Sequence, residues 1–180
     1  MDAKKEIMEK YDSTYMGYDK LYGEEQMEKY IEVIHEMGDI KGKIILDAGC
    51  GTGLLEKMLK EARQILGLDI SIKMLKRAKR RNKDKVKYSW IYADAENIPI
   101  KTKSIDLALM ITVIQNLPNQ LNALMEIKRI LRNNGETIIT YPKAHYIKEQ
   151  IIEQISKTNL IITEMRFTNT KDIVVKLKKE

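Results

Sequence analysis

Short apolar runs alternate with helical patterns along the chain from residue 43 onwards. This alternation is typical of a parallel β-sheet with helices on both faces, so an α/β fold is predicted. The parallel strands are predicted at residues 44–48, 64–68, 86–92, 105–111 and 137–141. The helices that follow them are predicted at about 54–62, 72–81, 119–131 and 145–157.

The C-terminal segment has a different pattern. Residues 160–167 and 172–177 each have the composition of a strand, and only the short polar segment 168–171 separates them. A connection of this length makes an antiparallel hairpin, because a parallel crossover requires a dozen or more residues. The sheet is therefore predicted to end in two antiparallel strands.

A stripe of aromatic side chains is present near the N-terminus. One methionine and four tyrosines follow one another at steps of three and four residues, and they are Met8, Tyr11, Tyr15, Tyr18 and Tyr22. This spacing places them on one side of a helix or helix pair. The stripe either packs the helix on the domain or forms a lid whose hydroxyls reach a ligand. Gly23 is expected to break the helix, and a second helix is expected from Glu24 to Gly38.

Composition limits the class of protein. The chain has 180 residues, of which 43% are hydrophobic and 32% charged, so residues 1–180 are expected to form one domain. Cys50 has no second cysteine to pair with, which favours a reducing compartment, and a cytoplasmic location is expected. The most apolar stretch, residues 107–114, is much shorter than the ~20 residues of a membrane helix. Neither a membrane span nor a metal site is expected.

The net charge of +6 is concentrated in one segment. Between Lys73 and Lys87, nine Lys and Arg residues stand against the single Asp84, a local net charge of +8. This basic strip either contacts the phosphate backbone of a nucleic acid or is the solvated face of a helix. The second role is the commoner one, so the strip alone identifies no partner.

A glycine-rich turn carries the clearest functional pattern. The segment Asp47-Ala48-Gly49-Cys50-Gly51-Thr52-Gly53 follows a predicted strand and opens a predicted helix. Glycines let the main chain pass close under a ligand, and the start of a helix offers unpaired amide donors. The turn therefore predicts a nucleotide-like ligand. Cys50 is interpreted as a small residue of this turn and not as a nucleophile.

Acidic residues follow the next two predicted strands. Asp69 lies 16 residues after Gly53, where its carboxylate can accept hydrogen bonds from both hydroxyls of a ribose. Asp94 ends the third strand, and with Ala95 its position suits an adenine edge. Each Asp alone could cap the following helix. Together with the glycines, the two acids favour an adenosine-like ligand.

The sequence resembles the class I S-adenosylmethionine-dependent methyltransferases, in particular the type-11 group related to ubiquinone and menaquinone methyltransferases. Four segments carry the resemblance in the family's order, and they are Ile44 to Gly53, Gly67 to Ser71, Asp94 to Pro99 with Ser104 to Asp106, and Ile127 to Gly135. The resemblance covers residues 43 to about 141. It implies a Rossmann-like three-layer sandwich with a seven-stranded sheet of order 3-2-1-4-5-7-6, in which strand 7 is antiparallel.

The resemblance also implies S-adenosylmethionine as cofactor and S-adenosylhomocysteine as its product. It assigns eight positions to the cofactor, and they are Asp47, Gly49, Gly51, Gly53, Asp69, Ile70, Asp94 and Ala95. The first four would surround the methionine and ribose, Asp69 would hold the ribose hydroxyls, and the last three would contact adenine. Residues 1–38 would form an N-terminal helical lid over the methionine end, and 43–180 would form the core.

The expected reaction is direct in-line methyl transfer. A methyl sulfonium is already activated, so the enzyme needs mainly a positioned nucleophile and the exclusion of water. No base is required, but Tyr18, Asn116 and His145 are candidates for orienting the acceptor or taking its proton. Gln115-Asn116 stands where relatives often have a histidine pair, and the Asn-Pro-Pro-Tyr tetrapeptide of many amide and nucleobase-amine methyltransferases is absent. This absence argues against such substrates without excluding them.

A small-molecule acceptor is favoured, because the predicted link from the fifth strand to the next helix is short. The alternatives are an RNA- or protein-modifying methyltransferase, with Lys73 to Lys87 as the nucleic-acid contact, and a methyltransferase-like binding domain without turnover. A partner-assisted enzyme also stays open. A nicotinamide-dependent dehydrogenase shares the glycine turn and Asp69, but it does not explain Asp94 or the terminal hairpin.

Overall fold

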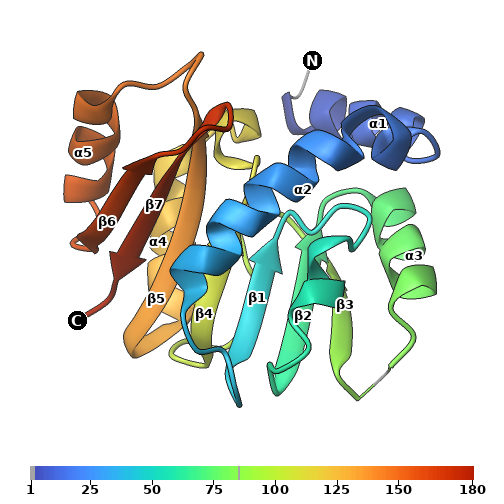
Figure 1. Cartoon of the computed structure of the whole chain (residues 1–180), viewed down its shortest axis with the longest axis horizontal. Helices are drawn as coiled ribbons and strands as arrows, with labels where there is room; N and C mark the ends of the chain where they lie inside the picture. The colour runs from blue at the N-terminus through green and yellow to red at the C-terminus, as the bar shows by residue number, and fades with distance from the viewer. Residues whose placement is uncertain (1–2, 85) are drawn as a thin grey trace.

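Seven strands form one sheet in the computed structural model, in the order β3-β2-β1-β4-β5-β7-β6 (Figure 1). They are β1 Ile44–Ala48, β2 Gln64–Asp69, β3 Tyr88–Tyr92, β4 Ile105–Met110, β5 Leu131–Pro142, β6 Ile161–Phe167 and β7 Asp172–Lys178. The structure describes residues 3–84 and 86–180, so Met1, Asp2 and Lys85 of the basic strip lie outside the described residues. The predicted α/β class and strand order are confirmed.

Parallel pairing brings the ends of five strands to one edge of the sheet. β1 pairs in parallel with β2 and β4, and β3 and β5 continue the sheet in the same direction on the two sides. β7 is antiparallel to both β5 and β6, which confirms the predicted hairpin. The carboxyl ends of the parallel strands therefore share one edge, the edge at which α/β sheets bind ligands.

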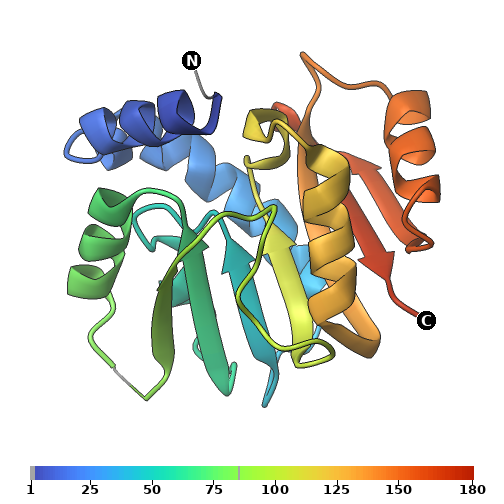
Figure 2. The ribbon, with the colours of Figure 1, turned by 180° about the vertical axis from the view of Figure 1, so that it is seen from behind.

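The helices are α1 Ala3–Thr14, α2 Tyr18–Met37, α3 Ile72–Arg81, α4 Gln120–Ile130 and α5 Lys148–Ser156, with short 3-10 helices at η1 Leu55–Met58 and η2 Ile114–Asn116. Alternate strand residues point to opposite faces of the sheet. Leu46 and Ala108 pack in a core with α4 and α5 (Figure 2), whereas Ile45 and Leu107 pack in a second core with α2. Across residues 3–84 and 86–180, no helix is long and apolar enough to cross a membrane.

The N-terminal helix does not break at Gly23, so that prediction is wrong. The chain turns at residues 15–17 instead, and α2 continues through Gly23. Gly38, with a φ of 62°, ends α2 as expected. A glycine inside a helix costs about 1 kcal/mol, and the burial of Val33 and Met37 near the end of α2 offsets this cost.

The predicted helix over residues 54–62 is also wrong, because only η1 forms there. The Leu59 amide donates to the Glu56 carbonyl at 3.2 Å, a spacing of three residues that is typical of tight 3-10 turns. α2 already crosses this face of the sheet (Figure 1) and shares a core with Leu55 and Leu59. The apolar side chains of the segment are thus buried without a regular helix.

Substitution of Gly53 by any residue with a Cβ atom is expected to destabilise the fold. The φ of Gly53 is 73°, and a Cβ atom would lie 2.8 Å from the Cβ and 2.9 Å from the Cα of Ala78 in α3. We expect Gly53→Ala to lower the free energy of unfolding by about 1–3 kcal/mol, because α3 would have to move. Gly17→Ala is the control, since Gly17 has a φ of −94° and a Cβ there would lie 3.9 Å from the nearest atom. Urea denaturation measures both variants, and equal stabilities would contradict this account.

Candidate functional site

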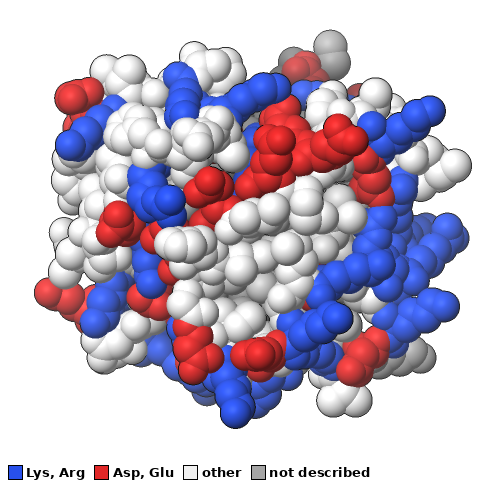
Figure 3. Space-filling model, viewed as in Figure 1, with Lys and Arg blue, Asp and Glu red and all other residues white. Residues whose placement is uncertain are grey.

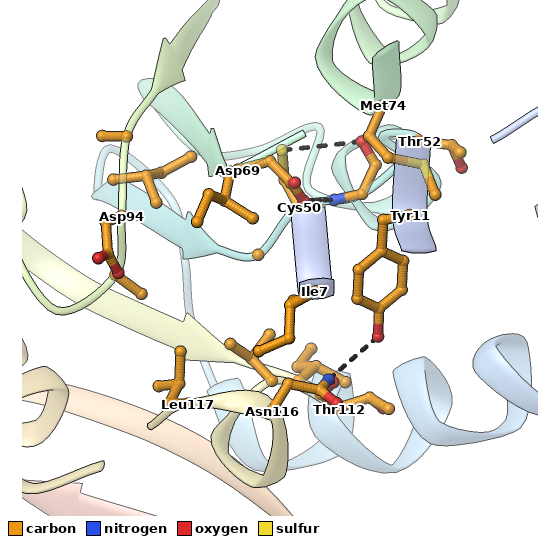
Figure 4. A pocket seen from close by; sticks show the side chains of 18 of the residues that line it. Ile7, Tyr11, Cys50, Thr52, Asp69, Met74, Asp94, Thr112, Asn116 and Leu117 are labelled. Atoms are coloured by element: carbon orange, nitrogen blue, oxygen red, sulfur yellow. Dashed lines mark hydrogen bonds between the residues drawn. The ribbon is translucent and has the colours of Figure 1, made fainter. Parts of the chain in front are cut away.

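A pocket lies at the carboxyl edge of the sheet, beside the glycine turn that follows β1 (Figure 4). Its walls come from this turn, from the ends of β2, β3 and β4, and from α1 and α2. The lining residues with a role assigned from the sequence are Gly49, Gly51, Asp69, Ile70, Asp94, Ala95, Tyr18 and Asn116. The remaining candidates, Asp47, Gly53 and His145, do not line this pocket.

The glycines of the turn have three different surroundings. A Cβ on Gly49 would lie 2.2 Å from Val113 Cγ2, so Gly49 allows the turn to pack against the segment after β4. Gly51 has a φ of 53°, and a Cβ there would meet nothing within 4 Å, so Gly51 leaves open space beside the pocket. Gly53 packs on α3, and its carbonyl accepts a hydrogen bond from Asn82 Nδ2 at 2.9 Å. Gly49 and Gly51 both line the pocket, but only Gly51 leaves open space for close approach of a ligand.

Two backbone amides hold the Asp69 carboxylate at the end of β2. Gly51 N donates to Oδ2 and Ser71 N donates to Oδ1, each at 2.8 Å. Burial raises the pKa of Asp69 to about 6, and the two amides oppose this rise. A carboxylate has about four acceptor positions, so capacity remains for the hydroxyls of a ligand.

Asp94 and Ala95 line another side of the pocket, next to Lys4 of α1. Lys4 Nζ lies 2.5 Å from Asp94 Oδ2 and 2.6 Å from Glu96 Oε2. These hydrogen bonds, with Asp94 the larger contributor, raise the pKa of Lys4, so its ammonium is charged at neutral pH. A ligand amine that approaches Asp94 would therefore compete with Lys4.

Asp47 lies behind the pocket wall together with Glu56 of η1. Asp47 is 4% exposed and Glu56 is fully buried. Burial, with a further effect of the Asp69 charge, raises the pKa of Asp47 to about 7. Burial and the charge of Asp47 raise the pKa of Glu56 well above its usual range, and neither Glu56 oxygen has a hydrogen-bond partner in the described part of the chain. These carboxyls therefore stay protonated at a pH where exposed ones are ionised.

Tyr11 and Tyr18 of the tyrosine stripe line the pocket, whereas Met8, Tyr15 and Tyr22 do not. From here on, the lid means residues 3–23, the part of the expected lid at 1–38 that carries the stripe. Asn116 Nδ2 donates to the Tyr11 hydroxyl at 3.0 Å (Figure 4), and the Tyr11 and Tyr18 ring centroids are 6.1 Å apart. Burial raises the pKa of both tyrosines, so both hydroxyls are neutral at physiological pH. Two of the four tyrosines of the stripe thus contact the pocket directly.

Asp19 joins the lid to the glycine turn and to α3. Its Oδ1 accepts from Thr52 Oγ1 at 2.6 Å, and its Oδ2 pairs with Arg77 Nη2 at 2.6 Å and with Arg81. Arg77 Nη1 also donates to the Met16 carbonyl at 2.7 Å. Burial opposes ionisation of Asp19, but the hydroxyl and the two guanidinium groups lower its pKa overall. The closed lid is therefore held by charged contacts.

These contacts divide the basic strip into two parts. Arg77 and Arg81 bind the lid, whereas Lys76, Lys79 and Arg80 are exposed. Figure 3 shows Lys and Arg side chains gathered where Figure 1 places α3. The helix is thus not merely a solvated face, because part of its charge is used at the pocket.

His145 lies in the wall of a second cavity that adjoins the pocket. Lys29, Gln115 and Asp172 also line this cavity, and Thr112 lines both cavities. His145 is thus separated from the first pocket, which Tyr18 and Asn116 line directly.

The sequence interpretation missed several lining residues, including Lys4, Gln26, Met74 and Thr112. Lys4 belongs to no motif and reaches the pocket only because α1 folds over the sheet edge. Thr112 has a φ of 60°, which is unusual for a β-branched residue. The local sequence does not predict this backbone conformation. Among the residues described, no group of three or more His, Cys, Asp or Glu is arranged to hold a metal.

Comparison with known proteins gives matches over most of the chain. The model of the type 11 methyltransferase domain matches residues 46–139. An uncharacterised protein of Methanocaldococcus jannaschii is 35% identical over 175 residues, which are 95% of this chain and 65% of that protein. The demethylmenaquinone methyltransferase of Staphylococcus saprophyticus is 31% identical over 107 residues, 57% of this chain and 46% of that protein. The chain thus spans less than two thirds of the length of these curated relatives.

Two solved structures share the fold at low sequence identity. One is a chain in the complex between the Haloferax volcanii Trm112 methyltransferase activator and a methyltransferase, with a TM-score of 0.85, 16% identity, and coverage of 93% of this chain and 96% of that chain. The other is magnesium protoporphyrin IX methyltransferase from Synechocystis PCC 6803 with bound S-adenosylmethionine, with a TM-score of 0.82, 17% identity, and coverage of 100% and 98%. These likenesses support the Rossmann-like fold.

The buried carboxyls predict a pH-dependent stability. Asp47 and Asp69 bind a proton more tightly in the folded protein than in the unfolded chain, where the pKa of Asp is about 3.9. Their contribution to folding is therefore complete below about pH 4 and is lost as the pH rises through about 6 and 7. We expect the Tm of the ligand-free protein to rise as the pH falls from about 8 to 5.5. Asp47→Asn should flatten this slope in thermal melts, and a Tm that falls towards pH 5.5 would contradict the assignment.

Proposed function

The chain belongs to the type 11 methyltransferase-domain family, and on this premise we propose that it binds S-adenosylmethionine in the pocket and transfers the methyl group to a small-molecule acceptor. One observation carries the proposal. Gly51 leaves open space, Asp69 is held by two amides, and Asp94 lies on another side of the same pocket. These are the groups that an adenosyl ligand requires at the ends of three adjacent strands.

The pocket fits this cofactor in chemistry and position. Asp69 would accept the ribose hydroxyls with the acceptor positions that its two amides leave unused. Asp94 would accept from the adenine amine, with Ala95 beside it and Ile70 against the ring. Gly49 and Gly51 would lie next to the methionine and ribose. Asp47 and Gly53 do not line the pocket and would act from behind its wall, where Gly53 allows α3 to pack closely.

The cofactor supplies a methyl group that is already activated on a sulfonium. The protein's own task is to place the acceptor in line with this methyl group and to exclude water. Tyr18 and Asn116 line the pocket and would orient the acceptor. Because burial raises the pKa of Tyr18, its hydroxyl would act as a neutral hydrogen-bond partner and not as a base. The lid would close the site.

A small acceptor suits this enclosed site better than a macromolecule. The second cavity beside Thr112 has about 370 Å³, within the usual range of small-ligand sites. The basic strip would then serve the lid through Arg77 and Arg81 and need not contact a nucleic acid. A cytoplasmic location is part of the proposal, since a chain with one cysteine requires no oxidising compartment.

Calorimetry with S-adenosylhomocysteine tests the proposal. We expect one molecule bound per chain, and we expect Asp69→Asn to weaken binding by about 1–3 kcal/mol because the ribose loses a charged acceptor. Asp106→Asn is the matched control, since Asp106 also accepts a backbone amide, from Ile44 at 2.7 Å, but lies at the start of β4. Heat with NAD and none with S-adenosylhomocysteine would overturn the proposal.

The closed lid leaves little room in the pocket. The cavity beneath it has about 90 Å³, whereas small-ligand sites usually have about 300–1,000 Å³. Lys4 also holds the Asp94 oxygen that the adenine amine would need. Cofactor entry therefore requires the lid to shift, and Lys4 would compete with the adenine amine for Asp94.

Removing Lys4 is thus expected to help the cofactor bind. We expect Lys4→Ala to lower the Kd for S-adenosylhomocysteine by about two- to fivefold, the range that such partly exposed ion pairs contribute. Lys5→Ala is the control, because Lys5 lies 3.9 Å from Glu9 on the same helix and does not line the pocket. Titration calorimetry compares them, and weaker binding by Lys4→Ala would show that Lys4 instead assists the cofactor.

A further inference from the structure

The second cavity adjoins the pocket at the carboxyl edge of the sheet. Thr112, which follows β4, lines both cavities. The other walls come from α2, from the segment after β5 and from the start of β7, and they include Lys29, Gln115 and Asp172. A molecule in this cavity would therefore lie next to a ligand in the pocket.

The three lysine ammonium groups in this wall are already paired. Lys29 Nζ lies 3.0 Å from Glu25 Oε1 and 3.3 Å from Asp172 Oδ2. Lys143 Nζ donates to two backbone carbonyls of the β6–β7 turn, at 2.6 Å and 2.8 Å. Lys171 Nζ pairs with Glu25 Oε2 at 2.6 Å. These ammonium groups balance charge in the wall but have little capacity left for a ligand.

Two acceptor atoms in the same wall are not used. Asp172 is 1% exposed, and within the described residues its Oδ1 receives no hydrogen bond, whereas its Oδ2 is ion-paired with Lys29. Gln115 Oε1 is also buried without a donor. Gln115 Nε2 donates to the Thr112 carbonyl at 3.0 Å, which fixes the orientation of this amide. Buried acceptors without donors are destabilising and rare, and the N–H groups of a ligand would satisfy them.

Charge determines which kind of donor fits. The three ammonium groups of the wall outnumber the carboxylates of Glu25 and Asp172, so a further cation would be repelled. An anion would find these ammonium groups already paired. We propose that the second cavity is the methyl-acceptor site and that it binds an uncharged primary amine, whose N–H groups donate to Asp172 and Gln115. This assignment rests on the proposed methyl transfer.

The charge state suits the chemistry, because an uncharged amine retains its lone pair. In the transfer, this pair forms a bond from nitrogen to the methyl carbon while the carbon–sulfur bond breaks and its electrons remain on sulfur. The sulfonium becomes a thioether, and the nitrogen becomes a methylated ammonium. One proton on this nitrogen then passes to the Asp172 carboxylate and from there to water.

Aniline is a suitable probe, because it is a primary amine that is uncharged at neutral pH. Benzoate and toluene have similar size but carry an anion or no donor. Ligand-observed NMR titrations on protein loaded with S-adenosylhomocysteine should show aniline binding at least about fivefold more tightly than either. Asp172→Asn, which has nearly the same shape, should weaken aniline binding at least about fivefold. Glu149→Gln on the exposed side of α5 should leave it unchanged.

Gln115→Met provides a second variant in case Asp172→Asn does not fold, and it should also weaken aniline binding. The assignment would be overturned if benzoate bound more tightly than aniline or if aniline did not bind. It would also be overturned if the folded variants bound aniline with unchanged affinity. Calorimetry with S-adenosylhomocysteine on the same samples separates the two proposals. If the unchanged protein does not bind S-adenosylhomocysteine, the methyltransferase function is contradicted. If it binds S-adenosylhomocysteine but not aniline, only the acceptor site is contradicted.

Discussion

The Asp69 carboxylate joins the glycine turn to the start of α3, and Ser71 connects this point to the lid. The Asp69 oxygens accept the amides of Gly51 and Ser71, so the turn after β1 and the start of α3 are held at a common point. Ser71 Oγ in turn caps α3 by accepting from Met74 N and donates to Asp12 of the lid. If the Asp69 carboxylate were lost, two backbone amides would be left without acceptors, and the glycine turn and the start of α3 would lose their common support.

The burial of several carboxyl groups around Asp69 lowers the stability of the fold. Asp47 and Glu56 are buried near Asp69, and burial raises the pKa of all three carboxyls. A fold selected for stability alone would place apolar side chains at such positions, and clusters of perturbed carboxyls are commoner at functional sites. The same logic applies to Asp172 in the second cavity, where buried oxygens without donors favour ligand binding at the expense of stability.

The lid and the cofactor would use the same groups. Lys4 holds Asp94, and Tyr11 is hydrogen-bonded to Asn116. Asp19 anchors the lid to Arg77 and Arg81, outside the part of the pocket that a ligand would fill. The lid can therefore stay attached through Asp19 while its N-terminal part yields to a ligand, which links binding to a movement of α1 and not to complete opening.

β5 begins at Leu131, six residues earlier than predicted, and Asp94 follows β3 by two residues. Apart from these offsets, local patterns predict the five parallel strands, the hairpin, the α3 and α4 helices and the placement of Asp69 and Asp94 after their strands. These features depend on local periodicity, and parallel strands bring their carboxyl ends to one edge whatever the details of packing. The tertiary structure decided which glycine packs and which approaches a ligand, because this depends on what each absent Cβ would meet. It also replaced the helix at 54–62 by η1, since α2 occupies the same face. Contacts such as Lys4 to Asp94 join residues far apart in the chain, and such pairs leave no local pattern for a sequence to show.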